Sequence, residues 1–195
     1  MTDQLLSVLR TYEDREIPAA GEYAVDPAHS SVEFIGRHLM ITKVRGRFPE
    51  VSGTIAIDEV PERSHVEVEI DVATLDTGNA QRDEHLRSPD FFHAEKHPTI
   101  KFESTKVEPG KSGRWAVTGD LTVRGVTRPV TLEVDFEGAN ASPMGDQRVA
   151  FSATTEVDRE DWGLTWNVAL ETGGVLVGKK VRIELNVQAV AAAGT

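Results

Sequence analysis

The sequence contains no cysteine and only twelve aromatic residues, counted as Phe 7, Trp 3 and Tyr 2, in a length of 195 residues. The absence of cysteine excludes disulfides, thiolate metal sites and a thiol nucleophile, so a metal could be held only by His, Asp or Glu. A transmembrane helix needs about 18 consecutive apolar residues, and the sequence has no such run. The length predicts one main domain, large enough to fold without a covalent staple.

Basic residues are also in short supply, because 21 Lys and Arg stand against 32 Asp and Glu, giving a net charge of −11. A general nucleic-acid partner needs a basic face, so that class is not expected. An acidic membrane surface repels such a chain on average, and no stable membrane insertion is expected. The first residues, 1–6, have neither the basic start nor the apolar core of a signal peptide, which predicts a cytoplasmic location.

Residues 1–21 are predicted to be an N-terminal extension and linker. Leu5, Leu6, Val8 and Leu9 have the spacing of one apolar helix face, and 18–21 are typical of a linker. We therefore expect a short terminal helix, either docked on the domain or free to bind a partner.

From residue 22 onward the hydrophobic period changes to two, which indicates β-strands with one dry and one wet face. Val66, Val68 and Ile70, for example, alternate with acidic residues. The clearest segments are 64–72, 115–123, 130–137 and 181–189. Strands of parallel sheets are buried on both faces, so this pattern predicts an antiparallel sheet. Weaker alternation elsewhere brings the expected total to about eight or nine strands.

Two local signals interrupt the strands. Asn79 is a good N-cap for a short helix over 80–87, which Pro89 ends. Gly125 lies between two strand-like segments and predicts a tight hairpin turn.

About eight antiparallel strands with one dry face are expected to close into a barrel, because closure removes the exposed sheet edges. A barrel of this size is either filled by side chains or holds one small ligand. Trp162 and Trp166 are expected either to plug its floor or to line a tunnel. Small residues at inward positions either leave room for a ligand or serve bends of the barrel: Gly36, Gly46, Gly53, Gly119 and Ala153.

No sharp catalytic or metal motif is present. The six histidines show no metal-site spacing, and there is no Gly-x-Ser-x-Gly elbow. His29, Asp83 and His85 are the acid–base candidates of an enzyme acting on a lipid-like substrate, provided that they converge in one pocket.

A basic cluster near the first predicted hairpin contrasts with the acidic composition. It consists of Arg37, Lys43, Arg45 and Arg47. Such a cluster is either a solvated face or a site for an anionic headgroup.

An ordered set of motifs resembles the YceI-like domain family, a lipocalin-like, polyisoprenoid-binding family. The matching residues are Asp26, His29-Ser30, Phe34 and His38; Gly46, Phe48 and Gly53; Arg82-Asp83, His85-Leu86 and Phe91-Phe92; Pro98 and Phe102; Gly119, Leu121-Thr122 and Arg124-Gly125-Val126-Thr127; and Gly163. The resemblance covers residues 22–190, and 191–195 are predicted to be a disordered tail.

The resemblance implies an all-β fold, an eight-stranded antiparallel lipocalin-like barrel with one short helix and an apolar tunnel. It implies a long-chain amphiphilic lipid as the partner, either a polyprenyl phosphate or an isoprenoid quinone, bound for transport, storage or sequestration. It implies no catalysis and no required cofactor. Many members of the family are exported, whereas this sequence shows no signal peptide.

Apolar residues at inward positions are the predicted ligand contacts. They are Phe34, His38, Phe48, Ile55, Ile70, Phe91, Phe92, Phe102, Trp115, Leu121, Phe151, Leu164 and Trp166. Homodimerisation through an apolar surface at Phe91 and Phe92 is left open. The alternatives to lipid binding are a filled barrel that serves as a stress or interaction protein, and the lipid-modifying enzyme described above.

Overall fold

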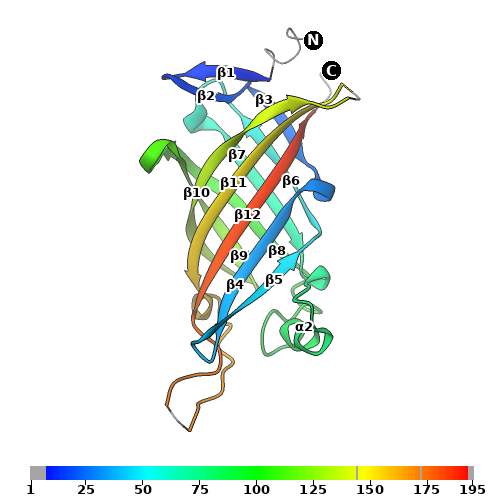
Figure 1. Cartoon of the computed structure of the whole chain (residues 1–195), viewed down its shortest axis with the longest axis vertical. Coiled ribbons are helices and arrows are strands. Elements are labelled where there is room, and N and C mark those ends of the chain that lie inside the picture. The colour runs from blue at the N-terminus through cyan, green and yellow to red at the C-terminus, as the bar shows by residue number, and fades with distance from the viewer. Residues whose placement is uncertain (1–7, 144, 172, 193–195) are drawn as a thin grey trace.

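The computed structural model describes residues 8–143, 145–171 and 173–192. Its main body is a closed antiparallel β-barrel (Figure 1). The strands of the barrel are β3 (Gly21–Val25), β4 (Ser31–His38), β5 (Thr42–Phe48), β6 (Val51–Ile57), β7 (His65–Asp71), β8 (Thr99–Pro109), β9 (Trp115–Val123), β10 (Val126–Ala141), β11 (Gln147–Asp158) and β12 (Lys180–Ala191). The predicted all-β, antiparallel barrel is therefore confirmed.

The ten labelled strands occupy eight strand positions in the barrel. β12 pairs with β3 near its end and with β4 near its start, so β3 and β4 are two halves of one interrupted strand. Likewise β5 pairs with β4 while β6 pairs with β3, and only residues 49–50 separate β5 from β6. The pairing of β11 with β12 closes the barrel, so each strand position has a neighbour on both sides.

The predicted local signals appear where they were expected. The one α-helix in the described part of the chain, α2, spans Ala80–Arg87, and Asn79 Oδ1 accepts the Arg82 amide at 3.0 Å. Arg124 and Gly125 both adopt left-handed backbone angles in the two-residue turn between β9 and β10. This geometry matches the right-handed twist of the flanking strands.

The predicted terminal helix is wrong over the described residues. Residues 9–18 form a β-hairpin, β1 (Leu9–Tyr12) and β2 (Arg15–Pro18), while the predicted helix positions Leu5 and Leu6 lie outside the described residues. The hairpin lies across the upper end of the barrel (Figure 1), where Val8 is fully buried and Ile17 is 3% exposed. Such burial depends on tertiary contacts, which override a weak helical period.

The hairpin is attached by more than apolar contacts. Arg10 Nη2 donates to the Asp58 carbonyl at 2.5 Å and Arg10 Nη1 to the Glu59 carbonyl at 2.7 Å. The Arg15 guanidinium lies 5.7 Å from the ring centroid of Trp115.

The predicted linker, 18–21, is shorter than expected. Pro18 ends β2 and Gly21 begins β3, so only residues 19–20 connect the two strands. At the other terminus, β12 includes Ala191, and 193–195 lie outside the described residues.

Short 3-10 helices complete the connections: η1 (Pro27–His29), η2 (Pro61–Arg63), η3 (Val72–Thr74), η4 (Lys111–Gly113) and η5 (Arg159–Trp162). None of the helices in the described ranges combines the length and apolar character that crossing a bilayer demands.

An ionic contact joins Asp26, between β3 and β4, to Arg148 of β11. It gives a pH-dependent prediction. The hydrogen bond from His29, followed by that from Arg148, holds the pKa of Asp26 below its ordinary value. Both partners contact Asp26 Oδ2, at 2.8 and 2.5 Å. A lowered carboxyl pKa contributes stability above the ordinary pKa, and this contribution is lost as pH falls through the lowered value.

Asp26→Asn should therefore unfold at lower urea concentration than the wild type at about pH 7, and the difference should shrink toward about pH 3. Urea unfolding at both pH values measures this, with the exposed Asp120→Asn as the control. A difference that stays constant across this range would show that the carboxylate charge has no role.

Candidate functional site

The barrel encloses one large apolar cavity of about 470 Å³. The inward faces of the strands line it, and many of these side chains are only half-buried because they face the cavity. Its volume lies within the range of roughly 300–1,000 Å³ that is usual for small-molecule sites. An interior filled by side chains, as the filled-barrel alternative requires, is not what the structure has.

All thirteen predicted ligand contacts, most at inward strand positions and four in loops, lie on the wall of this cavity. They are Phe34, His38, Phe48, Ile55, Ile70, Phe91, Phe92, Phe102, Trp115, Leu121, Phe151, Leu164 and Trp166. That these side chains contact a ligand stays a prediction.

Three of the predicted residues form an aromatic cluster between the barrel wall and the loop after α2. The ring centroids of Phe34 and Phe48 are 5.5 Å apart, and Phe92 lies 5.7 Å from Phe48 and 6.4 Å from Phe34. Phe91 is buried at 5% exposure, and both Phe91 and Phe92 face the cavity. This loop therefore offers no exposed apolar surface to a second copy, and homodimerisation there stays an untested prediction.

The small inward residues do not all leave empty space. A Cβ on Gly46 would lie 2.6 and 2.8 Å from ring atoms of Phe34, and one on Gly119 would lie 2.5 Å from the ring of Phe102. These glycines are thus covered by phenylalanine rings. Gly36 differs, because a Cβ there would meet no heavy atom within 4 Å, and it lines the cavity.

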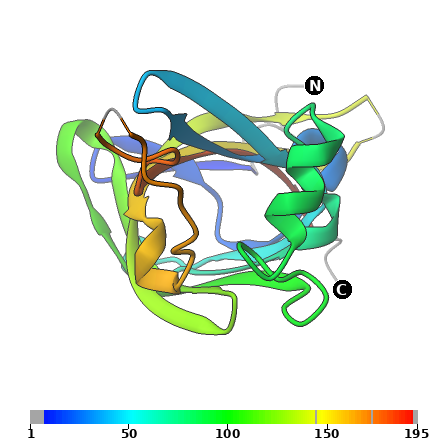
Figure 2. The ribbon, with the colours of Figure 1, turned by 90° about the horizontal axis from the view of Figure 1, so that it is seen from below.

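The basic residues of the cavity wall lie at its lower end, near α2 and η5. Figure 2 shows this end from below, with α2 and the segment after η5 on opposite sides. Arg82, His85 and Arg159 line the cavity there. The His85 ring packs edge-on against Trp166, with centroids 4.6 Å apart, and its Nε2 lies 2.9 Å from Asp90 Oδ2.

Arg159 is the most unusual of these side chains because it is a cation at only 6% exposure. Its guanidinium donates to the backbone carbonyls of Gly178, Val177 and Leu164, and no carboxylate is paired with it in the described part of the chain. Burial lowers the pKa of the guanidinium. Its three bonds hold the loop after η5 at the lower end, and Arg159 is among the residues that line the cavity there.

The most exposed residues of the cavity wall lie at the same end. They are Arg37 and His38, at the end of β4. At the upper end Ile17 and Pro18 of the hairpin and Pro61 of η2 are buried, while Ser64 and Trp115 are half-buried. From this difference in exposure we infer that the lower end is the mouth of the cavity. Trp162 and Trp166 line the lower part, and Trp162 Nε1 donates to the Leu121 carbonyl at 3.0 Å.

The enzyme hypothesis required convergence of three side chains, and the structure separates them. Asp83 is buried and accepts from the Thr77 amide and hydroxyl. His85 is bonded to Asp90 and His29 to Asp26. Neither Asp83 nor His29 lines the cavity. The predicted acid–base group is not assembled.

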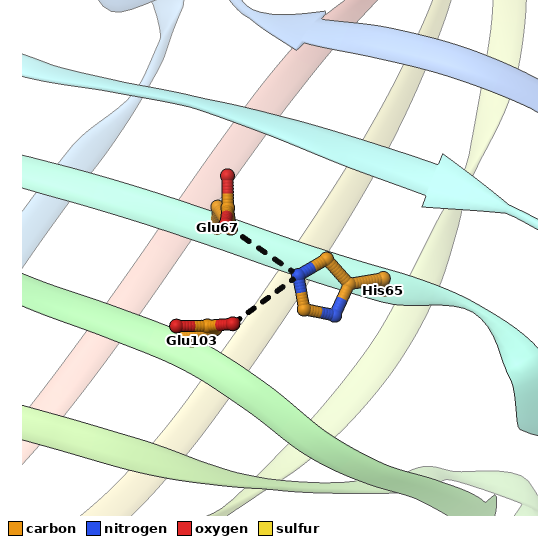
Figure 3. Close-up of side chains that lie close together, drawn as sticks. All are labelled: His65, Glu67 and Glu103. Atoms are coloured by element: carbon orange, nitrogen blue, oxygen red, sulfur yellow. Dashed lines mark ion pairs between the residues drawn. The ribbon is translucent and has the colours of Figure 1, made fainter.

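A second cluster of ionisable groups lies on the outer wall of the barrel (Figure 3). His65 Nε2 is 3.7 Å from Glu67 Oε1 and 3.9 Å from Glu103 Oε1, while Ser104 Oγ lies 3.2 Å from His65 Nδ1. His65, Glu67 and Glu103 each offer one atom that could bind a metal ion, and these atoms lie within 4.8 Å of one another. The cluster faces solvent on β7 and β8, so it is not part of the cavity.

Some residues of the cavity wall were not among the predicted contacts. Leu132, Phe136, Leu185 and Val187 line the cavity and share the inward parity of strands that were recognised. Strand parity alone would have found them. Arg159 gives no such signal, because it lies in a run of charged residues typical of an exposed loop.

Comparisons with known proteins agree with this architecture. The family model described as the YceI-like domain matches residues 23–189. The UPF0312 protein VPA0850 of Vibrio parahaemolyticus is 40% identical over 148 residues, 74% of this chain and 78% of that protein.

Two solved structures show the same fold at lower identity. BcnA of Burkholderia cenocepacia superposes with a TM-score of 0.71 at 24% identity, covering 84% of this chain and 98% of that one. A polyisoprenoid binding domain from Saccharophagus degradans has a TM-score of 0.66 at 14% identity, covering 87% of this chain and 98% of that one.

Proposed function

Since the chain belongs to the YceI-like domain family, we propose that it binds one long-chain isoprenoid amphiphile in its apolar cavity. The observation that carries the proposal is the cavity itself, lined mostly by apolar residues and with its basic residues near the lower end. The family match and the fold shared with a polyisoprenoid binding domain support it. The role is that of a binding protein for transport, storage or sequestration.

The distribution of charge gives the bound molecule one orientation. The tail extends upward among the aromatic and aliphatic side chains, and the headgroup lies near Arg82, His85 and Arg159 at the lower end. Cationic donors suit a phosphate, and N–H donors also suit the carbonyls of a quinone. A polyprenyl phosphate and an isoprenoid quinone are the two candidate ligands.

The tail supplies most of the affinity in this arrangement. Each buried methylene contributes about 0.8 kcal/mol, so ten contribute about 8 kcal/mol before the costs of association are subtracted. The headgroup contacts then select the chemical class. We expect no catalysis, because the three predicted acid–base residues do not converge: His85 lines the cavity, whereas Asp83 and His29 do not. A cytoplasmic location stays part of the proposal.

Native mass spectrometry of the purified protein, followed by organic extraction, tests the proposal. We expect a stoichiometric adduct whose mass identifies a polyprenyl phosphate or a quinone. Added ligand at about one hundred times its Kd should stabilise the fold by about 2.7 kcal/mol. If purified protein carries no lipid and neither ligand class raises the Tm, the lipid-binding function is wrong.

A further inference from the structure

Large apolar side chains that remain exposed are rare in the described ranges, and most of them are concentrated at one place. They are Leu39 at 38% exposure, Met40 at 53%, Ile41 at 77%, Val60 at 36% and Val168 at 45%. Three are consecutive and form the turn between β4 and β5, at the lower end of the barrel (Figure 1). An apolar surface gathered in this way, on a chain that is mostly acidic, indicates an interaction site.

Val168 belongs to the same surface because the two loops are hydrogen-bonded. The Leu39 amide donates to the Leu176 carbonyl at 2.8 Å, and the Leu176 amide donates to the Val168 carbonyl at 3.0 Å. We call Leu39, Met40, Ile41 and Val168 the lower tip.

The backbone of the turn presents these side chains at a conformational cost. Leu39 and Met40 have φ of +52° and +59°, and the Ile41 amide donates to the His38 carbonyl at 3.0 Å. Both central positions of such a turn favour Asn or Gly. Bulky apolar residues in the left-handed region are strained, so local folding preference does not explain their presence.

Basic side chains border the lower tip. Arg37 and Lys43 are directly opposite each other on β4 and β5, both exposed, and neither has an ion-pair partner in the part of the chain that the structure describes. Arg45 and Arg47, farther from the turn, are paired with acids. Two like charges side by side repel each other, and an anionic surface relieves that repulsion.

The lower tip also adjoins the mouth of the cavity. Arg37 and His38, the exposed members of the cavity wall, immediately precede Leu39. The neighbouring loop carries one acidic residue, Glu171, which does not offset the basic pair. An apolar tip with unpaired cations beside it matches the interface of a bilayer with anionic headgroups.

We propose that the lower tip docks reversibly onto an anionic lipid bilayer, with the mouth of the cavity facing the membrane. Leu39, Met40 and Ile41 enter the headgroup region, and Arg37 and Lys43 contact lipid phosphates. The net charge of −11 opposes association on average, and the exposed apolar turn beside Arg37 and Lys43 favours this face. The docking rests on the tip alone, and its purpose, exchange of ligand with the membrane, rests on the proposed function.

Co-sedimentation with vesicles tests the docking. The wild type should bind vesicles of phosphatidylcholine and phosphatidylglycerol, and bind vesicles of phosphatidylcholine alone more weakly. Lys43→Glu should weaken binding to the anionic vesicles by roughly tenfold, because it reverses one surface charge. Ile41→Asp should abolish binding. Val60→Asp is the matched control, because Val60 is also apolar and exposed but follows Glu59, which contacts the hairpin at the upper end.

A second measurement reports the position of the tip directly. The chain has no cysteine, so Ile41→Cys and Val60→Cys each provide one labelling site for a polarity-sensitive fluorophore. The label at 41 should shift to the blue on anionic vesicles, and the label at 60 should not.

Equal vesicle binding by Ile41→Asp and Val60→Asp, both with unchanged Tm, would overturn the proposal, as would absence of binding by the wild type. Extraction of lipid from the same preparations separates this result from the proposed function. Vesicle binding by a protein that holds no extractable lipid leaves the docking intact and removes the carrier function. Bound lipid without vesicle binding does the reverse.

Discussion

A Gly36→Trp variant should fold normally and lose its long-chain ligand. Gly36 lies on the cavity wall, and a Cβ there meets no heavy atom within 4 Å, so the side chain enters open space. An indole would displace several carbons of the tail just inside the mouth. At about 0.8 kcal/mol for each carbon, the loss of four weakens binding by roughly two hundredfold.

Titration of the lipid-free protein with a polyprenyl phosphate or quinone measures this change, and thermal unfolding verifies the fold. Gly36→Ala is the control and should bind within a few-fold of the wild type, because one methyl leaves the tunnel open. A Gly36→Trp protein that keeps its Tm and its affinity would place the ligand somewhere other than this cavity.

Gly53→Ala should be among the most destabilising alanine substitutions in the barrel. A Cβ at this position would press on the carbonyl oxygen of Glu67 and lie 3.0 Å from the Cα of Val68. Both atoms belong to the backbone of β7, which pairs with β6, so neither can move without disrupting the sheet. We expect a loss of about 3 kcal/mol, which lowers the Tm by about 6–12 °C.

The same substitution at Gly36 is the matched control, since both glycines lie in strands and neither has a positive φ. Calorimetry of the two variants separates crowding from the general effect of replacing glycine. Equal Tm values for Gly53→Ala and Gly36→Ala would show that β6 and β7 can separate at this point at little cost.

Much of the candidate site could be predicted because strand parity is a strong constraint. In a one-sided strand every second residue faces the same way, so Trp115 and Leu121, once assigned to β9, had to point together. Both line the cavity, as do the other predicted contacts; Phe91, Phe92, Leu164 and Trp166 among these lie in loops, where parity does not apply. The cap at Asn79 and the turn at Gly125 depend on local chemistry, which sequence also records.

Other features depend on partners that are distant in sequence. Gly46 and Gly36 have the same parity, yet Gly46 is covered by the Phe34 ring and Gly36 is open. The β1–β2 hairpin is stabilised by the burial of Ile17 against the barrel, which a local period cannot reveal. Arg159 is a buried cation only because the loop carbonyls of Val177 and Gly178 converge on it.

The hairpin across the upper end has a consequence for selectivity. With Ile17 and Pro18 buried across one end of the barrel, the proposed ligand would enter tail first, and leave headgroup first, through the other end. The distance from Arg159 to the hairpin would then determine which tail length fits the cavity. Isoprenoids with tails shorter than this distance leave apolar wall uncovered, and longer ones hold their headgroups outside the mouth. If the protein binds an isoprenoid as proposed, the length of the barrel, rather than any single contact, would therefore set the number of isoprene units that it accepts.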